Sequence, residues 1–301
     1  MDLLVEHRYE TYLEVDRVRL HGGFVGKVYY PPRSWNRAQF IAERAAAHRV
    51  SYEYYGHPRV PVIKRSWPAP RRTVSSATLY AAICVKLLSM LEGERSGAHI
   101  RDIDISAVNV LGPSPGSSLA KLGELLNAHA LDEAGCDGAG GHAAFVSVLL
   151  RRLWDRRADE LFPAYLNKLR YSQGAGSASP GIPLPLVALV KTLAKIMWRE
   201  YGTIFSIREL SRLLDNVSSR EHRDLVRMLN CMLKDEVLHF HYLRVVLAEL
   251  TSLCQLTDGF VPENPVVTLV QEAASEVARE NEAACRAYRA VLKTLGVPAF
   301  P

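Results

Sequence analysis

The stretch KDEVLHFHYL, residues 234–243, decides between two folds for the C-terminal half of this chain. As a helix, it places Glu236 and His239 one turn apart, which is the Glu-x-x-His spacing of paired metal ligands. As a strand, it places its large apolar residues on one face and His239 and His241 on the other. The helix would indicate a metal centre, whereas the strand would indicate the edge of a small binding domain.

The residues before this stretch predict three helices. Segment 186–202 has apolar residues at intervals of three and four, which is the spacing of a helix that buries one face. Two short helices are expected to follow, because Ser206 with Glu209 and Ser218 with Glu221 are capping boxes, which mark helix starts. Two capped helices behind a covering helix form the plan of a helix-turn-helix unit.

The third of these helices has a row of polar and basic side chains on its outward face. The row consists of Arg220, Arg223, Arg227, Asn230 and Lys234. Because their spacings are 3, 4, 3 and 4, they form one stripe on a helix, where guanidinium groups can contact phosphate or guanine. Arg208 and Arg212 on the preceding helix can reach the flanking nucleic-acid backbone. The alternative is a solvated helix face on which acidic neighbours pair with the arginines.

In its pattern this segment resembles winged-helix DNA-binding domains, over about 60 residues. The resemblance implies a three-helix fold and a recognition helix that contacts nucleic acid, without pointing to a specific family. A wing normally contains a turn with Gly, Asn or Pro, and none of these residues occurs between Lys234 and Asp258. Continuation of the third helix is therefore the alternative to a wing strand.

The metal interpretation of the opening stretch needs more ligands than the local sequence provides. Carboxylate-bridged di-metal bundles use two Glu-x-x-His pairs and two further glutamates on separate helices, and this chain has a single such pair. We therefore expect an edge strand and no metal or other cofactor, with Glu236, His239 and His241 as the candidate ligands of the alternative. Asp102 and Asp104 can also hold a divalent ion, although a loop or a helix cap is the favoured interpretation.

The overall fold class predicted is α+β, mostly α. A stretch rich in Gly, Ser and Pro, residues 171–183, is expected to link an N-terminal α+β domain (1–172) to a C-terminal helix-turn-helix domain (184–301). Within the N-terminal domain, residues 1–70 are predicted to be β-rich. Residues 76–150 follow the order helix, short helix, helix and hairpin, which makes them a second winged-helix candidate.

The β-rich start contains two further signals. Gly22-Gly23 lies between two strand-like runs and predicts a hairpin. Many tyrosines precede a basic stretch that contains Arg65, Arg71 and Arg72. Aromatic faces beside cations suit nucleic acid, and they equally suit ordinary sheet packing, so both interpretations stay open.

A long helix is predicted over residues 264–296, because Asn264-Pro265 is a good helix start and Gly296 a good stop. Its small apolar residues alternate by three and four, with Asn281 in the middle. That pattern is typical of a dimer seam in which a polar residue sets the register. The alternative is that its small side chains let this helix pack on its own domain.

Composition narrows the functional classes. The chain has 301 residues and a net charge of +5, and its most apolar stretch, PLPLVALVKTLAKIM, contains two lysines and is too short for a membrane helix. Five cysteines with no C-x-x-C pair indicate a reducing cytoplasm. We predict a non-enzymatic nucleic-acid-binding protein that contacts double-stranded DNA, in a regulatory or a replication or repair role. One alternative is a structural or accessory subunit of a larger nucleoprotein complex. A second is a metal-dependent enzyme.

Overall fold

The structure, a computed structural model, describes much of the chain, but not all of it. The described residues are 13–15, 18–20, 22–29, separate positions between 83 and 94, 97–136, 138–153, 182–215, 220–254 and 264–294. Helices make up 83% of these described residues, which confirms the prediction of a mostly α protein.

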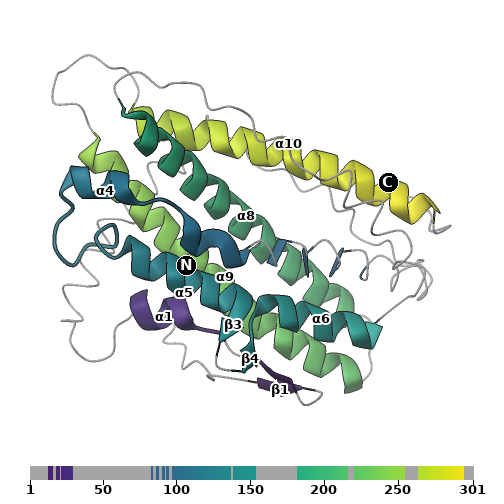
Figure 1. The fold of residues 1–301 in the computed structure, drawn as a ribbon. Helices are drawn as coiled ribbons and strands as arrows, with labels where there is room; N and C mark the ends of the chain where they lie inside the picture. The colour runs from purple at the N-terminus through teal and green to yellow at the C-terminus, as the bar shows by residue number, and fades with distance from the viewer. Residues whose placement is uncertain are drawn as a thin grey trace.

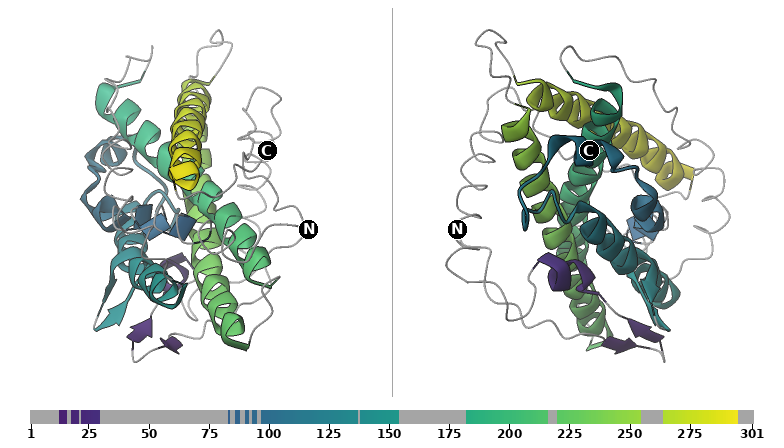
Figure 2. Two further views of the ribbon diagram at one scale, coloured as in Figure 1. Left: turned by 90° about the vertical axis from the view of Figure 1, so that its right-hand side faces the viewer. Right: turned by 60° about the vertical axis from the view of Figure 1, so that its left-hand side comes forward.

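Three long helices form the C-terminal part of the fold, namely α8 (Leu184–Asp215), α9 (Arg220–Leu253) and α10 (Pro265–Thr294). Figure 1 shows α8 and α9 side by side and running in opposite directions, with α10 lying along α8. The two views in Figure 2 show the same packing from other sides. These helices form the framework on which the shorter N-terminal helices are placed.

The predicted break between the first and second helices of a helix-turn-helix unit is wrong. Ser206 and Glu209 lie inside α8, which continues without interruption to Asp215. The physical reason is burial: Ile207, Leu210 and Leu214 extend the apolar face of the first half of α8 and are themselves buried. The capping box is therefore not used as a helix start.

The predicted edge strand over residues 234–243 is also wrong, because this stretch lies in the middle of α9. Buried residues recur along α9 at helical spacing before, within and after the stretch. They include Leu225, Met228, Leu229, Met232, Glu236, His239, Leu243, Val246 and Leu250. A strand would have placed half of these side chains in solvent, so the helix buries far more surface.

The shorter N-terminal helices pack on α8, on α9 and on one another. They are α1 (Phe24–Tyr29), the 3-10 helix η1 (Ala98–Asp102), α4 (Ser106–Leu111), α5 (Leu122–Ala134) and α6 (His142–Leu153). Figure 1 shows α5 and α6 in front of α8 and α9, and α1 beside α5. Residues 76–150 are predicted to end in a hairpin, whereas residues 142–153 form α6, because Phe145, Val146 and Leu149 are buried at helical spacing. The described residues from 97 to 153 run as η1, α4, α5, a short hairpin over residues 135–140 and α6, so the hairpin predicted in this region is short and is followed by a helix.

Short strands complete this region as one sheet in the order β1-β2-β4-β3. The strands are β1 (Leu13–Val15), β2 (Val18–Leu20), β3 (Gly135–Cys136) and β4 (Ala139–Gly140). The hairpin joins β1 to β2, so it precedes Gly22 instead of surrounding it, and the chain after Gly23 is helical. The β-rich segment predicted for residues 1–70 is not supported by the part of it that the structure describes.

One hydrophobic core includes residues from both sides of the predicted linker. Leu125 of α5, Leu193 of α8 and Leu243 of α9 belong to the same buried cluster.

Among the described helices, none is both long and apolar enough to cross a membrane.

Helix α10 confirms the predicted C-terminal helix closely. Asn264 caps its start, since the Val266 amide donates to Asn264 Oδ1 over 3.0 Å. Val270, Ala274 and Val277 are buried, and the Trp198 indole donates to the Val270 carbonyl over 3.3 Å. The first half of the predicted dimer seam therefore packs inside this chain, whereas Asn281 is exposed.

Candidate metal centre

The interior between α5, α6, α8 and α9 contains a cluster of histidines and carboxylates. Its members are Glu94, His129, Asp132, Glu133, His142, Glu200, Asp235, Glu236 and His239. All are buried except Glu200, whose side chain is 12% exposed. Burying so many ionisable groups costs much free energy unless they pair with one another or bind an ion, so the cluster indicates a functional site.

Each of the three histidines is held from outside through one of its ring nitrogens. The pairs are His129 Nδ1 with the Tyr242 hydroxyl at 2.9 Å, His142 Nε2 with Asp235 Oδ2 at 3.3 Å, and His239 Nε2 with Asp132 Oδ2 at 3.0 Å. Metal-binding histidines almost always have such an outer partner, which orients the ring and fixes the nitrogen that faces the metal. All three rings are therefore arranged as metal ligands are.

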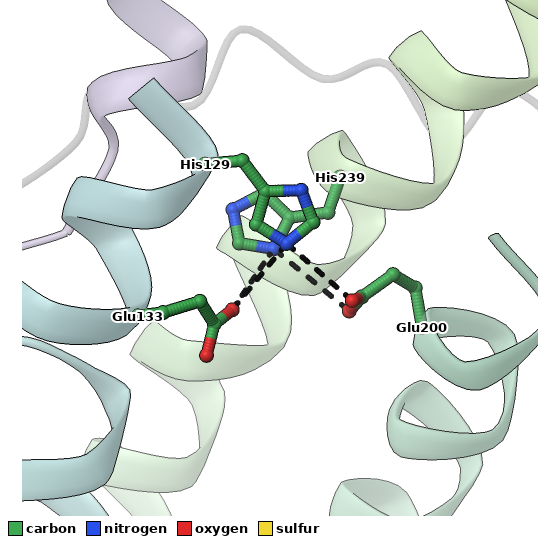
Figure 3. Close-up of side chains that lie close together, drawn as sticks. All are labelled: His129, Glu133, Glu200 and His239. Carbon is green, nitrogen blue, oxygen red and sulfur yellow. Dashed lines mark ion pairs between the residues drawn. The ribbon is translucent and has the colours of Figure 1, made fainter. Parts of the chain in front are cut away.

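The other nitrogen of each ring faces carboxylates of the cluster. Figure 3 shows His129 and His239 pointing toward Glu133 and Glu200, and the two rings stack with centroids 3.7 Å apart. His129 Nε2 lies 3.5 Å from Glu133 Oε1 and 3.4 Å from Glu200 Oε1. His142 Nδ1 lies 3.2 Å from Glu133 Oε1 and 3.0 Å from Glu236 Oε1. Nitrogens and oxygens thus converge on one small volume.

Most of these inward-facing atoms have no hydrogen-bond partner of suitable geometry in the described part of the chain. They are His129 Nε2, His142 Nδ1, His239 Nδ1, Glu133 Oε2 and both carboxylate oxygens of Glu236. Buried polar atoms are rarely left without a partner, and each needs an explanation. Imidazole nitrogens and carboxylate oxygens are ligands of divalent transition metals, and in two sets of four residues the ligand atoms lie within 4.8 Å of one another. The residues present therefore fit bound metal ions.

The contacts divide the ligands into two positions that share two glutamates. Position A consists of Glu94 and His142, whose Oε2 and Nδ1 are 3.6 Å apart, and position B consists of Glu200, His129 and His239. Glu133 and Glu236 approach the histidines of both positions. Two shared carboxylates between two histidine-containing positions are the arrangement of a dinuclear site.

The two positions follow a repeated sequence pattern. Glu94 precedes the Asp132-Glu133 dipeptide by 38 residues, and Glu200 precedes Asp235-Glu236 by 35. In each repeat the aspartate holds a histidine of the other, since Asp132 contacts His239 of α9 and Asp235 contacts His142 of α6. The site is therefore approximately symmetric, although no fixed-period repeat is visible in the rest of the sequence.

His129 breaks this symmetry. It lies three residues before Asp132, and the residue three before Asp235 is Met232. Position B consequently has two imidazoles, and position A has one.

A tight turn explains why the second histidine does not follow a Glu-x-x-His pattern. In the second repeat His239 comes three residues after Glu236, on the same helix. In the first repeat α5 ends at Gly135, which has a φ of 82°, and β3 and β4 turn the chain back before His142 begins α6. A Cβ on Gly141 would lie 2.4 Å from the Asp132 carbonyl oxygen, so only glycine allows this close return.

Without metal, two histidines supply positive charge to the cluster: burial alone would lower the pKa of His142 and His239, but the neighbouring carboxylates raise both well above the ordinary value. Burial raises the pKa of Glu236 to about 8, and the Glu200 carboxylate adds to this shift. Burial also raises the pKa of Glu133 well above its ordinary value. In contrast, burial lowers the pKa of His129 to about 4, so this imidazole stays neutral with a lone pair for a metal.

The structure places the sequence-predicted metal candidates in different environments. Glu236 and His239 belong to the cluster, whereas His241 is half-buried on another face of α9, where its ring meets Tyr29 edge-on at 6.1 Å. Asp102 and Asp104 are exposed, and Asp104 Oδ1 accepts a hydrogen bond from the Ser106 amide in the loop that leads into α4.

The predicted nucleic-acid contacts are only partly described. Arg208, Arg227 and Asn230 are exposed, and Lys234 is half-buried. The side chains of Arg212, Arg220 and Arg223, and the whole of Arg65, Arg71 and Arg72, lie outside the described residues.

Most of the candidate ligands were not predicted from the sequence. The missed residues are Glu94, His129, Glu133, His142 and Glu200. The His129-x-x-x-Glu133 spacing and the recurrence of Asp-Glu after a distant glutamate are the signals that could have indicated them.

Comparison of the chain with protein-family models, with curated proteins and with solved structures finds no match.

Proposed function

We propose that this protein binds two divalent transition-metal ions at positions A and B and uses them in oxidation–reduction chemistry. One observation supports this proposal above all. Three buried histidines are each held from outside, and their inward nitrogens lie close to the carboxylates of four glutamates. These nitrogens and several of the carboxylate oxygens have no hydrogen-bond partner of suitable geometry among the described residues. A purely structural cluster would not need three oriented imidazoles with unpaired inner nitrogens.

The charge of the site favours two ions over one. Glu94, Glu133, Glu200 and Glu236 carry four negative charges when ionised, and the histidines that bind a metal are neutral. Two divalent cations balance these four glutamate charges, whereas a single cation balances only two of them, which is unfavourable for buried groups. The other two buried carboxylates of the cluster, Asp132 and Asp235, pair instead with His239 and His142.

The ligand set favours iron or manganese over zinc. Structural zinc sites are tetrahedral and closed by four ligands, usually with cysteine, and none of the cysteines that the structure describes belongs to this cluster. Shared glutamates with histidines, inside a helical bundle, are the ligands of di-iron and di-manganese proteins. When bound, such a pair of ions supplies electron-transfer or dioxygen chemistry. The chain's own contribution is to orient the ligands and to exclude bulk water.

The two positions differ in the room they leave for an external molecule. Both receive the shared glutamates, but among the described residues position B has two further histidines and a glutamate, whereas position A has His142 and Glu94. With one donor fewer, position A is where an exogenous ligand can bind with the least rearrangement.

Anaerobic titration of the metal-free protein with Fe²⁺ tests this proposal. We expect about two ions per chain, followed by oxygen consumption when air is admitted. The double variant Glu133→Ala/Glu236→Ala, which lacks both shared carboxylates, is expected to lose both effects. Asp102→Asn/Asp104→Asn removes two exposed carboxylates and should change neither. Equal metal content in all three proteins would contradict a metal centre here, and metal uptake without oxygen consumption would contradict the dioxygen chemistry.

Nucleic-acid binding is a second, separate proposal. Its support is that Arg208 on α8 and Arg227 and Asn230 on α9 are exposed. Each lies more than one helical turn along its helix from the nearest candidate metal ligand, Glu200 on α8 or Glu236 on α9. A gel-shift assay with single- and double-stranded probes at two salt concentrations tests it, with Arg227→Ala and Arg208→Ala expected to weaken binding and reduce its salt dependence. Binding that neither substitution alters would remove these arginines from the proposal.

A further inference from the structure

The chain between β2 and α1 lies against both aspartates that hold metal-facing histidines. Leu20, the last residue of β2, pairs with Gly140 of β4, two residues before the ligand His142. The chain then passes through Gly22 and Gly23 into α1, which packs on α5 and α9. This path brings an N-terminal segment into the outer surroundings of a site whose ligands all come from elsewhere in the chain.

The first contact is with Asp132. Its carboxylate accepts hydrogen bonds from the Phe24 amide, over 2.7 Å to Oδ1, and from the Val25 amide, over 3.1 Å to Oδ2. The same Oδ2 lies 3.0 Å from His239 Nε2. One buried oxygen therefore joins the backbone of this segment to a ligand of position B.

The second contact is with Asp235. A Cβ on Gly22 would lie 2.0 Å from Asp235 Oδ2, which is closer than any side chain can approach. That oxygen is also the one that contacts His142 Nε2, a ligand ring of position A. Gly23 has a φ of 80°, a left-handed conformation that glycine adopts without strain and that leads the chain into the Asp132 contacts.

We propose that Gly22–Val25, here called the clamp segment, sets the metal affinity of both positions by holding Asp132 and Asp235. This inference rests on the proposed metal function. The clamp segment acts on position A through the absence of a side chain at Gly22, and on position B through two backbone amides. None of its residues is a metal ligand, so these are positioning residues.

Gly22→Ala tests the effect of the clamp segment on position A alone, because the three atoms nearest to a Cβ on Gly22 all belong to Asp235. The added methyl group displaces Asp235 Oδ2 and should lower the affinity for one of the two ions by about 10- to 100-fold, because loss of an outer partner has this effect on the affinity of metal sites. The probe is Co²⁺, whose visible absorption reports its ligands during titration. Gly202→Ala is the matched control, because a Cβ there meets nothing within 4 Å. Binding of two Co²⁺ ions by Gly22→Ala with unchanged affinities would overturn the proposal.

A double-mutant cycle distinguishes positioning from simple damage to the fold. With Asp235→Ala already present, Gly22→Ala should cause no further loss of Co²⁺ affinity, because the oxygen that it displaces is gone. Equal losses in both backgrounds would show that Gly22 acts through general packing and would overturn the proposal. Failure of the unsubstituted protein to bind Co²⁺ would instead contradict the proposed function itself.

Hydrogen exchange on the unsubstituted protein provides a test that needs no folded variant. If the clamp segment stabilises bound metal, bound metal must stabilise the clamp segment to the same extent. Adding Co²⁺ should therefore slow exchange of the Phe24 and Val25 amides, while a peptide from the buried face of α10 serves as the reference. Identical exchange at residues 24 and 25 with and without Co²⁺ would overturn the proposal.

Discussion

Asp132 holds the outer face of His239, with 3.0 Å between Asp132 Oδ2 and His239 Nε2. Because Nε2 is taken up by this contact, Nδ1 of the same ring faces inward, 3.5 Å from Glu133 Oε1. The pairing assigns one nitrogen to orientation and the other to a ligand role, as in carboxylate–histidine–metal triads. The same division holds for His142 with Asp235, so the site is built twice from one local device.

His239 and His241 provide a matched pair for testing the site. Both were metal candidates in the sequence, yet only His239 has a nitrogen in the cluster. We expect His239→Ala to lose the ion at position B, with affinity lowered at least about 10-fold, and His241→Ala to retain both ions. Elemental analysis after dialysis against limiting Fe²⁺ measures the difference. Equal metal contents in the two variants would place the metal elsewhere.

His129 is expected to make position B the tighter of the two positions. His129→Met installs the residue that Met232 provides at the equivalent place of the other repeat, so position B keeps one imidazole. We predict that two separate binding steps in a Co²⁺ titration move closer together, because the tighter step weakens by about 10-fold or more.

Met232→Leu is the control for this variant. Met232 is fully buried, and a swap of similar volume usually costs less than about 1.5 kcal/mol. Both binding steps should be retained in Met232→Leu. A titration of His129→Met that matches the unsubstituted protein would show that the ring is not a ligand.

Glu236 should make the metal-free protein less stable as pH rises. Its pKa is about 8 in the folded protein, against 4.5 when exposed, so its favourable contribution is complete below pH 4.5 and is lost as pH rises toward 8. Glu236→Gln removes the ionisable group and should raise the free energy of unfolding relative to the unsubstituted protein by on the order of a few kcal/mol at pH 8.

Urea denaturation of both metal-free proteins at pH 5 and pH 8 measures this effect. At pH 5 the difference in unfolding free energy should be small, because Glu236 is largely protonated in the folded protein. With Fe²⁺ present the order should reverse at pH 8, since the ions require the carboxylate that Gln lacks. A pH-independent difference between the two metal-free proteins would contradict a raised pKa.

Local signals in the sequence predicted the ends of helices better than their continuity. Asn264-Pro265 and Gly296 bracket α10 because capping and stop residues act within a few positions. The capping box at Ser206 satisfies the same local rule inside α8, where burial of Ile207 and Leu210 outweighs it. Local rules cannot tell these cases apart, because the deciding apolar partner lies on another helix.

The candidate site was harder to predict, because its ligands are far apart in sequence. Glu94 and His239 are separated by 145 positions and belong to one cluster only after the helices have packed, Glu94 beside His142 and His239 beside Glu236. Glu236 and His239 share the Glu-x-x-His motif on α9, and His129 and Glu133 lie one helical turn apart on α5. His142 could not be recognised by the Glu-x-x-His pattern, because a hairpin, and not a helical turn, brings it back to Glu133.

The packing of α10 on α8 yields a test of whether this helix serves the monomer or a dimer. Ala274 is fully buried, and ion pairs flank this interface. They are Lys191 with Glu272 at 2.7 Å, Lys195 with Glu276, and Arg199 with Glu280 at 3.1 Å. Ala274→Ile adds volume to a close-packed contact, so we expect it to lower the free energy of unfolding by about 1–3 kcal/mol at any protein concentration.

Asn281→Ile changes the exposed position of the same helix and is the matched control. In a monomer it should leave the free energy of unfolding within about 0.5 kcal/mol of the unsubstituted protein, because this side chain contacts solvent. Were Asn281 the register-setting residue of a dimer seam, the same substitution would instead alter the oligomeric state, since a buried polar residue specifies partner and register. Light scattering across a tenfold range of protein concentration distinguishes the outcomes. A change of mass with Asn281→Ile would contradict the assignment of α10 to the monomer fold, and unchanged stability of Ala274→Ile would do so independently.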